Sequence, residues 1–291
     1  MSASNPTSHV TFLDGRGELP MLEIITPWST AEIYLHGAHV THFKKNGEPP
    51  LLFLSQCSRF EAGAPIRGGI PVIFPWFGKP TDKPGQHGFV RHREWALKSI
   101  QSPADGSVTV RLVLPNSPEL ANGQIAVEYV VEINDRLTAE LIVTNQTAQP
   151  FTFENCLHTY FTVGDIKAVS VTGLKGAEYL NQPTGFSRHT DTDDAIRFTG
   201  EVDRAYLNTA STTEIHDPSL HRVIRVEKDG SQSTVVWNPW IAKAKAMPDY
   251  GDEEYQQMVC VESGNVKENE ITLAAGQTSR LKVTLGSAVS N

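Results

Sequence analysis

The sequence predicts an all-β protein of antiparallel strands, and three observations support this prediction. Apolar residues recur at every second position in several segments, which is the period of a strand with one buried face. Turn-forming pairs such as Asn46-Gly47, Asp105-Gly106 and Asp229-Gly230 separate these segments. Helical periodicity is scarce. Many strands with few helices are typical of a β-sandwich or barrel.

The expected elements follow the chain. The clearest alternation predicts strands at 108–114, 125–133, 137–143 and 281–285. Weaker patterns predict further strands at 21–26, 31–36, 38–43, 166–172, 222–228, 233–237 and 258–262. One or two helical turns are expected within 250–257. The irregular stretch 57–93 is long for a loop in a compact domain, and long ordered loops often carry function.

Length and composition indicate an ordinary globular protein. The 291 residues, 39% apolar and 20% charged, suit a single domain spanning 1–291, with a flexible N-terminus over about 1–10. The formal net charge of −8 argues against nucleic-acid and acidic-membrane partners. No signal peptide or run of transmembrane length is visible, so a cytoplasmic location is expected. A monomer is expected.

The cysteines and three early histidines argue against metal sites. Cys57, Cys156 and Cys260 are far apart and lack the Cys-x-x-Cys spacing of zinc ligands, which predicts reduced thiols. His36, His39 and His42 lie in strand-like sequence, where alternate side chains point to opposite faces and three ligands do not converge. The sequence therefore predicts no metal site at these residues.

Two basic segments are candidates for binding an anion. Arg67 precedes Gly68-Gly69 in a loop rich in proline and aromatic residues, where glycines would let the backbone approach a ligand. The alternative is a rigid crossover with a solvated arginine. In an extended chain, Arg91 and Arg93 would face the same way and could hold a phosphate. The alternative is a solvated strand edge.

A histidine and a glutamate are the candidates for acid–base chemistry. The segment 151–161 is predicted to be one strand with an apolar core face, and His158 lies on its other, mixed face. A histidine satisfied by a neighbouring carbonyl is the alternative. Glu262 ends the apolar strand 258–262, where partial burial would raise its pKa toward that of a general base. Asp203 is a candidate for binding hydroxyl groups, and Trp237 for stacking on a sugar.

The chain resembles the hexose-6-phosphate mutarotases of the aldose 1-epimerase superfamily. The resemblance runs from about residue 22 to the C-terminus, and its motifs occur in the expected order. They are IRGGIPVIFPWFG (66–78), QHGFVR (86–91), LHTYF (157–161), WNPWIAKAKA (237–246) and MVCVE (258–262).

The resemblance implies a galactose-mutarotase-like super-sandwich of antiparallel sheets that needs no cofactor or metal. Carried over by position, His158 and Glu262 look like the catalytic pair. The substrate-binding positions implied by the resemblance are Arg67, Gln86, Arg91 and Asp203, and His87, Arg93 and Trp237 are further candidates.

The implied reaction exchanges the α and β anomers of an aldohexose 6-phosphate, with glucose 6-phosphate as the expected substrate. Glu262, ionised, would take the proton of the C1 hydroxyl, and protonated His158 would supply one to the ring oxygen. Three alternatives remain open: an aldose 1-epimerase for unphosphorylated sugars, a non-catalytic carbohydrate-binding protein, and a glycosidase. A glycosidase would pair Glu262 with Asp203 or Glu154. Loss of activity in favour of an interaction role is a further alternative.

Overall fold

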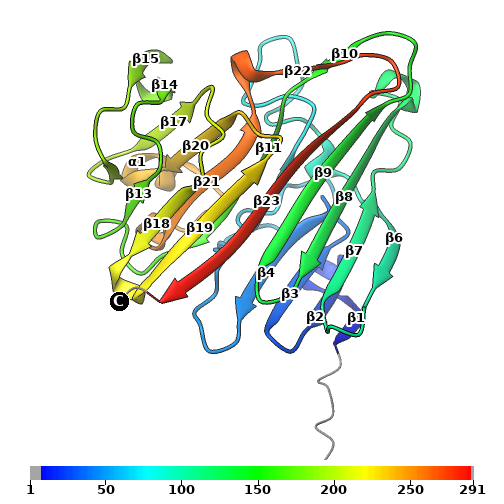
Figure 1. Cartoon of the computed structure of the whole chain (residues 1–291), viewed down its shortest axis with the longest axis horizontal. Coiled ribbons are helices and arrows are strands. Elements are labelled where there is room, and N and C mark those ends of the chain that lie inside the picture. Colours follow the sequence, from blue (N-terminus) through cyan, green and yellow to red (C-terminus); the bar gives the residue numbers. More distant parts are fainter. Residues whose placement is uncertain (1–7, 290–291) are drawn as a thin grey trace, which may run out of the picture.

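A nine-stranded antiparallel sheet forms one layer of the molecule. We describe residues 8–289 of a computed structural model of the chain. The sheet is the front layer in Figure 1. Its strands, in spatial order, are β16 (Ala195–Arg197), β13 (Ser170–Thr172), β18 (Thr213–Asp217), β19 (Arg222–Asp229), β23 (Thr278–Val289), β9 (Leu137–Asn145), β8 (Ile125–Ile133), β7 (Val108–Val113) and β6 (Ala96–Gln101).

An eight-stranded sheet carries the central part of the site. Its order is β15 (Ser187–Thr190), β14 (Glu178–Asn181), β17 (Val202–Tyr206), β20 (Ser233–Asn238), β21 (Met258–Asn265), β11 (Asn155–Leu157) and β5 (Val72–Ile73). The eighth strand, β12 (Tyr160–Thr162), also pairs with β21. Strand β21 is therefore central, with β20 along one edge and β11 and β12 in succession along the other.

Two smaller sheets and short helices complete the fold. A four-stranded sheet contains β1 (His9–Asp14), β2 (Pro20–Ile25), β3 (Ser29–Tyr34) and β4 (His39–Lys45), and β10 (Phe151–Phe153) pairs with β22 (Ile271–Leu273). The helices are α1 (Trp240–Ala246) and the 3-10 turns η1 (Arg16–Glu18), η2 (Val90–His92), η3 (Ala121–Gly123), η4 (Gln182–Thr184), η5 (Pro218–Leu220), η6 (Glu254–Gln257) and η7 (Lys267–Asn269). Among residues 8–289, no helix is long and apolar enough to cross a membrane.

One hydrophobic core joins the sheets. Ile33 of β3, Val131 of β8 and Val261 of β21 belong to the same buried cluster although they come from three different sheets. Each strand contributes the apolar residues of one face, so alternation in the sequence becomes burial between layers. The predicted super-sandwich of antiparallel sheets is confirmed.

Most predicted strands are confirmed, and the exceptions have local causes. The predicted strand 166–172 shortens to β13. The segment 151–161 is not one strand but three, because Glu154 and His158 turn away from regular pairing. The Glu154 carboxylate accepts the backbone N–H groups of Phe77 and Lys267, and the N–H of His158 donates to the carbonyl of Pro71.

The structure also differs from the prediction in its helices and at the N-terminus. Helix α1 was not predicted, and of the turns expected at 250–257 the structure forms η6. Residues 1–7 of the predicted flexible terminus lie outside the described residues, whereas His9 and Val10 already belong to β1.

Candidate active site

His158 and Glu262 meet across two neighbouring strands. Cys156 on β11 pairs with Gly264 on β21, and Tyr160 on β12 pairs with Cys260. His158 lies in the step between β11 and β12, and Glu262 lies between the two partners on β21. Nε2 of His158 is 3.3 Å from Oε1 of Glu262, and the side chains are only 9% and 1% exposed. The pair predicted from sequence therefore forms one buried contact.

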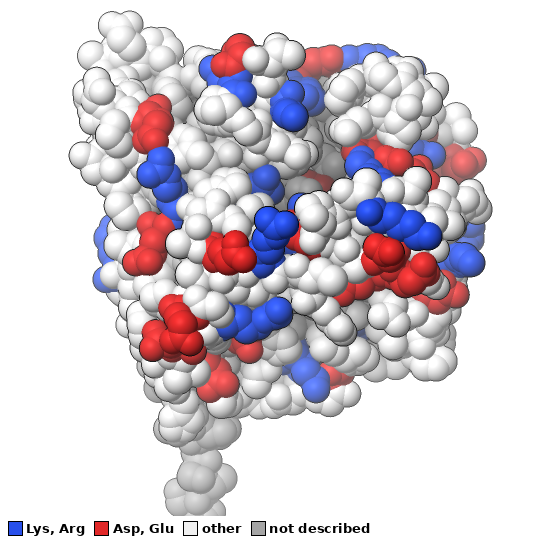
Figure 2. Space-filling view, turned by 180° about the vertical axis from the view of Figure 1, so that it is seen from behind, with Lys and Arg blue, Asp and Glu red and all other residues white. Residues whose placement is uncertain are grey.

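A cavity of about 580 Å³ opens above this pair. The face shown in Figure 2 is hollowed near its centre, and Lys and Arg side chains border the hollow. Eight of the nine residues singled out in the sequence line the cavity: Arg67, Gln86, His87, Arg91, His158, Asp203, Trp237 and Glu262. Segments far apart in the chain thus converge on one site.

Arg93 is the exception, and the expectation that it shares a face with Arg91 is wrong. Residues 90–92 form the 3-10 turn η2 instead of an extended strand, so the two side chains diverge. Arg91 is buried and lines the cavity. Arg93 lies in a separate depression, half exposed, and its Nη2 is 2.5 Å from Oε1 of Glu119.

Aromatic rings hold the His158 imidazole in place. The ring stacks on Tyr160 with centroids 4.9 Å apart and planes inclined by 15°, and Trp237 meets it edge-on at 5.9 Å. The Tyr160 hydroxyl accepts a hydrogen bond from Arg67, 3.1 Å away. Contacts on several sides restrict rotation of the ring, so Nε2 stays directed at Glu262.

The two cavity arginines are held in different ways. Arg67 donates to both carboxylate oxygens of Asp249, with Nη2 3.0 Å from Oδ2. Burial acts to lower the pKa of Arg67, but Tyr160 and Asp249 outweigh burial, so the pKa is raised. Arg91 donates to the carbonyl of Gln86 at 2.9 Å, but its buried Nε has no partner among the described residues. Burial and the Arg67 charge lower the pKa of Arg91 to about 10.

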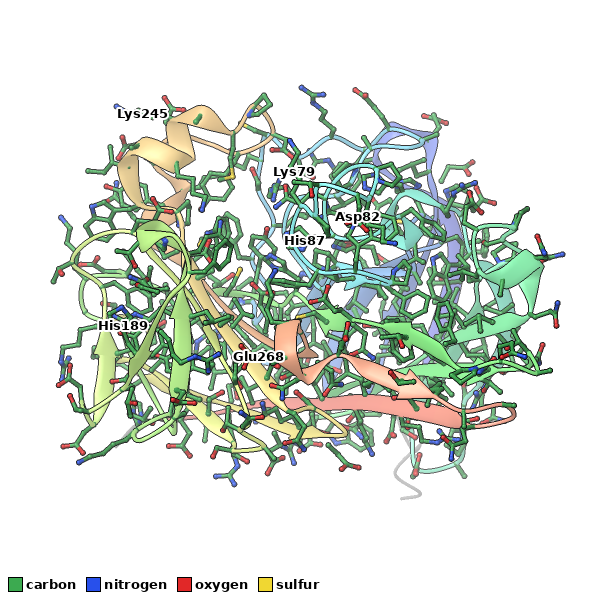
Figure 3. The ribbon with its side chains drawn as sticks, turned by 90° about the horizontal axis from the view of Figure 1, so that it is seen from above. Lys79, Asp82, His87, His189, Lys245 and Glu268 are labelled. Carbon is green, nitrogen blue, oxygen red and sulfur yellow. The ribbon has the colours of Figure 1, made fainter. Side chains whose placement is uncertain are left out.

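The loop of residues 78–87 lines the cavity and carries Gln86 and His87. The loop closes on itself because the N–H of His87 donates to the carbonyl of Gly78, and the N–H of Gly78 donates to Nδ1 of His87. In Figure 3, Lys79, Asp82 and His87 mark this loop near the middle of the molecule. The Gln86 amide nitrogen lies 2.9 Å from Nε2 of His87. Burial and the Arg91 charge lower the pKa of His87 well below its usual range.

The glycines beside Arg67 serve chain packing. A Cβ at Gly68 would lie 2.5 Å from the carbonyl oxygen of Phe53, and one at Gly69 would lie 2.2 Å from that of Val40. Both glycines also have positive φ, at 119° and 61°. The sequence predicts that these glycines let the backbone approach a ligand. In the structure, Gly68 and Gly69 let it approach the backbone of neighbouring segments.

Asp203 and Trp237 stand side by side on paired strands. They are register partners on β17 and β20. The Asp203 carboxylate accepts a hydrogen bond from Lys243 of α1 at 3.1 Å. Burial raises the pKa of Asp203, while Lys243 opposes the shift. Lys243, missed from the sequence, therefore accompanies the predicted hydroxyl-binding residue.

The pKa shifts of the catalytic candidates oppose the protonation states that the expected mechanism requires. Burial, and to a lesser degree Asp203, raises the pKa of Glu262 well above its usual range. Burial, Arg91 and Arg67 lower the pKa of His158 to about 3. These shifts favour a proton on the Glu262 carboxyl group over a proton on the His158 imidazole.

Besides Lys243, three charged residues of the cavity were not predicted as ligand-binding residues. Lys79 and Lys267 line its mouth, and neither pairs with a carboxylate among the described residues. Glu154 lines the wall, where its two backbone hydrogen bonds, from Phe77 and Lys267, tie the loop after Phe77 to η7. Lysines in polar loops carry no local signal of a site, since most of them are solvated.

One group near the cavity floor has the residue types of a metal site. Ligand-type atoms of His158, Cys260 and Glu262 lie within 4.8 Å of one another. Two of these atoms, Nε2 of His158 and Oε1 of Glu262, already face each other at 3.3 Å, and the contact is that of the acid–base pair predicted from the sequence.

The three early histidines are occupied separately, in agreement with the sequence argument. His36 and His39 each contact a backbone carbonyl, of Ala64 and Gly68 respectively, and His42 contacts the hydroxyl of Thr30. They do not converge on a shared ligand.

Known proteins resemble this chain along nearly its whole length. The model of the family described as aldose 1-epimerase matches residues 20–286. A "putative glucose-6-phosphate 1-epimerase" of Cenchrus ciliaris is 37% identical, covering 90% of this chain and 82% of that protein. A protein of the same name from Escherichia coli K12 is 34% identical, with coverages of 87% and 85%. The crystal structure of a "putative mutarotase" from Salmonella typhimurium superposes with a TM-score of 0.88 at 30% identity, covering 99% and 96%.

Proposed function

The chain belongs to the aldose 1-epimerase family and is an epimerase, and we propose that it interconverts the α and β anomers of an aldohexose 6-phosphate. Glucose 6-phosphate is the first substrate to test, because relatives at 34–37% identity are named for it. The observation that carries the proposal is the 3.3 Å contact between His158 and Glu262 beneath a cavity lined by Arg67 and Arg91. An acid–base pair suits ring opening, and two guanidiniums suit a phosphate.

The proposed reaction moves two protons. Glu262, as carboxylate, removes the proton of the C1 hydroxyl, while imidazolium His158 protonates the ring oxygen O5 and the C1–O5 bond breaks. The open-chain aldehyde rotates about C1–C2 and presents its other face. O5 then attacks C1, returning its proton to His158, while Glu262 reprotonates O1. The enzyme ends in its starting state, and no other reactant is consumed.

The phosphate would also prepare His158 for its role. Burial, followed by the charges of Arg91 and Arg67, lowers the pKa of His158 to about 3 and so favours the neutral imidazole. A phosphate dianion bound between these guanidiniums would offset their charge and add an attraction for imidazolium. Binding would thereby move the proton of the pair toward His158. The same arginines would anchor the substrate and link its phosphate to the protonation of the acid.

Other cavity residues would orient the sugar. Asp203 and Gln86 offer polar groups for ring hydroxyls, and Trp237 offers an apolar edge. A positioned reactant can gain several kcal/mol, up to about 7–11, through proximity and orientation. The alternative of a glycosidase is less well supported, because Glu154 is engaged by two backbone N–H groups and Asp203 by Lys243.

Exchange spectroscopy tests the proposed function directly. Two-dimensional exchange NMR on the wild-type enzyme should show rapid exchange between the C1 signals of α- and β-glucose 6-phosphate, with kcat/KM at least about 100-fold above that for glucose. Equal efficiency on both sugars would replace the proposal with an aldose 1-epimerase for unphosphorylated substrates. Binding of either sugar without accelerated exchange would leave a carbohydrate-binding protein.

We further propose that the enzyme works as a monomer in the cytoplasm. Sugar phosphates are charged and stay within cells, and the free thiols Cys57, Cys156 and Cys260 suit a reducing compartment. Light scattering after gel filtration should give a mass near 32.0 kDa. A mass of twice that value would contradict the monomer.

A further inference from the structure

The two oxygens of the Glu262 carboxylate have different partners. Oε1 faces Nε2 of His158 at 3.3 Å. Oε2 accepts a hydrogen bond from the Cys156 thiol, whose sulfur lies 3.4 Å away. Among residues 8–289, no other group donates to this carboxylate. The thiol is completely buried and does not line the cavity, so it reaches the carboxylate from behind.

The strand opposite Cys156 leaves room for the thiol. Cys156 on β11 pairs with Gly264 on β21, two residues beyond Glu262. A Cβ at Gly264 would lie 2.9 Å from both Cβ and Sγ of Cys156, closer than real side chains approach. Because the same Cβ would also lie 2.5 Å from the carbonyl oxygen of Asn155, the glycine leaves room both for the neighbouring backbone and for the sulfur.

Several apolar side chains pack around Cys156. Its cluster contains Ile73, Phe77, Ala205, Val235 and Val266. Val235 is also the register partner of Glu262 on β20. In such surroundings an ionised carboxylate loses its hydration, and a single hydrogen bond to it gains importance.

We propose that Cys156 is a positioning residue, whose S–H group holds the ionised Glu262 carboxylate in the orientation that serves both His158 and the sugar. This inference rests on the proposed function. The S–H group would compensate in part for burial, since a hydrogen bond to the charged form of an acid favours ionisation. In agreement, the thiol acts to lower the pKa of Glu262, against the dominant effect of burial.

Several charged groups set the background for this contact. Around Glu262, Asp203 on β17 opposes ionisation, whereas Arg91 on η2 favours it. His158 faces the carboxylate directly. Around Cys156, burial and Glu262, and to a lesser degree Glu154, keep the pKa of the thiol well above its usual range, although Lys228 on β19 favours the thiolate. The thiol therefore remains a donor at every pH of interest.

Variants at the two buried cysteines test the proposal. Cys156→Ala should lower kcat for anomer exchange of glucose 6-phosphate about tenfold and leave KM within twofold, because the thiol does not line the cavity. The acid limb of the kcat/KM profile should move to higher pH, since Glu262 loses a donor that favours ionisation. Cys156→Ser should restore most of kcat and return the limb toward its original position.

Cys260→Ala is the matched control. It removes a thiol that is equally buried and lies on the same strand as Glu262, but that makes no hydrogen bond to the carboxylate. Its acid limb should stay within about 0.2 pH units of wild type. If Cys156→Ala and Cys260→Ala gave the same profile as each other, or if serine failed to restore activity in a folded variant, the proposal would be overturned.

Infrared spectroscopy provides a test that does not depend on folding of a Cys156 variant. In the wild-type protein saturated with glucose 6-phosphate, one S–H stretching band should lie at low frequency because the thiol donates to the Glu262 carboxylate, and Glu262→Gln should move that band upward. A spectrum without such a moving band would refute the hydrogen bond. Absence of anomer exchange by wild-type enzyme would instead refute the proposed function.

Discussion

Strands β8 and β21 are similar in length but differ in how they are covered. The nine residues of β8 alternate between buried and partly exposed, whereas all eight residues of β21 are buried. One face of β8 packs on the core and the other meets water. In β21, Val259, Cys260 and Val261 belong to the core cluster, whereas Glu262 lines the cavity.

This difference in burial determines which glutamate is a candidate for acid–base chemistry. Glu128 on the outer face of β8 keeps access to water, and its ion pairs with Lys98 and Arg111 lower its pKa despite partial burial. Burial instead raises the pKa of Glu262 well above its usual range. The same residue type is thus a surface partner on one strand and a candidate base on the other, because the second strand is covered on both faces.

Replacing Glu262 of β21 and Glu128 of β8 by glutamine should give the largest difference in kcat between the two strands. Glu262→Gln should reduce kcat for glucose 6-phosphate by about 10²–10⁴-fold, since it removes a positioned base. Binding should persist, because Gln keeps the shape of the side chain. Exchange NMR measures the rate and calorimetry measures binding. Glu128→Gln is the matched control, and its kcat should stay within twofold. Near-normal exchange by Glu262→Gln would remove the base from the mechanism.

The arginines extend the comparison between buried and exposed charge. Arg91→Ala should raise KM for glucose 6-phosphate about 100-fold and change that for glucose less than threefold, because its buried Nε is free to bind phosphate. Steady-state kinetics with both sugars measure this difference. Arg93→Ala, which removes an exposed partner of Glu119, should leave both values within twofold. Equal losses for both sugars in Arg91→Ala would contradict phosphate anchoring.

Adding the anion separately tests whether phosphate also protonates the acid. Inorganic phosphite should raise kcat/KM for glucose about tenfold at saturation, since an anion at Arg67 and Arg91 removes part of what lowers the pKa of His158. The gain is limited because burial, the largest cause of the shift, remains. Polarimetry with glucose measures it, and Arg91→Ala should abolish it. No activation at any phosphite concentration would leave the arginines as anchors only.

Much of the fold follows from alternation in the sequence. The pattern of β8 predicts both its existence and its bounds, because one dry face and one wet face produce a period of two. The predicted strand 258–262 is also found, within β21, but its composition does not reveal what covers its second face. Parity places His158 on a mixed face, and Glu262 stands out as a carboxylate at the end of an apolar strand, but only the family resemblance pairs the two residues.

Other parts of the site have no local signal. An extended chain would place Arg91 and Arg93 on one face. The short turn η2 separates their side chains instead. Helix α1 has seven residues and begins at Trp240, whose φ of 56° is unfavourable for a helix, so its packing rather than its sequence supports it. Lys267 reaches the cavity because its backbone N–H is held by Glu154, a contact 113 positions away.

Core truncations should give the smallest effect on activity and separate stability from chemistry. Val131 of β8 and Val259 of β21 are both fully buried, so replacing either by Ala should cost about 2 kcal/mol of unfolding free energy through the cavity it leaves. Val131→Ala should leave kcat unchanged. Val259→Ala should lower kcat about threefold, because small shifts of β21 move Glu262 relative to His158.

Urea unfolding and exchange NMR on both variants measure these two quantities. Matching losses of stability with different kcat values would mean that the position of β21 limits the chemistry. Equal kcat values would mean instead that the contacts around the carboxylate, from His158 and Cys156, hold it independently of the core beneath. In that case the precision of the site would reside in its own side chains, and β21 would serve only as their support.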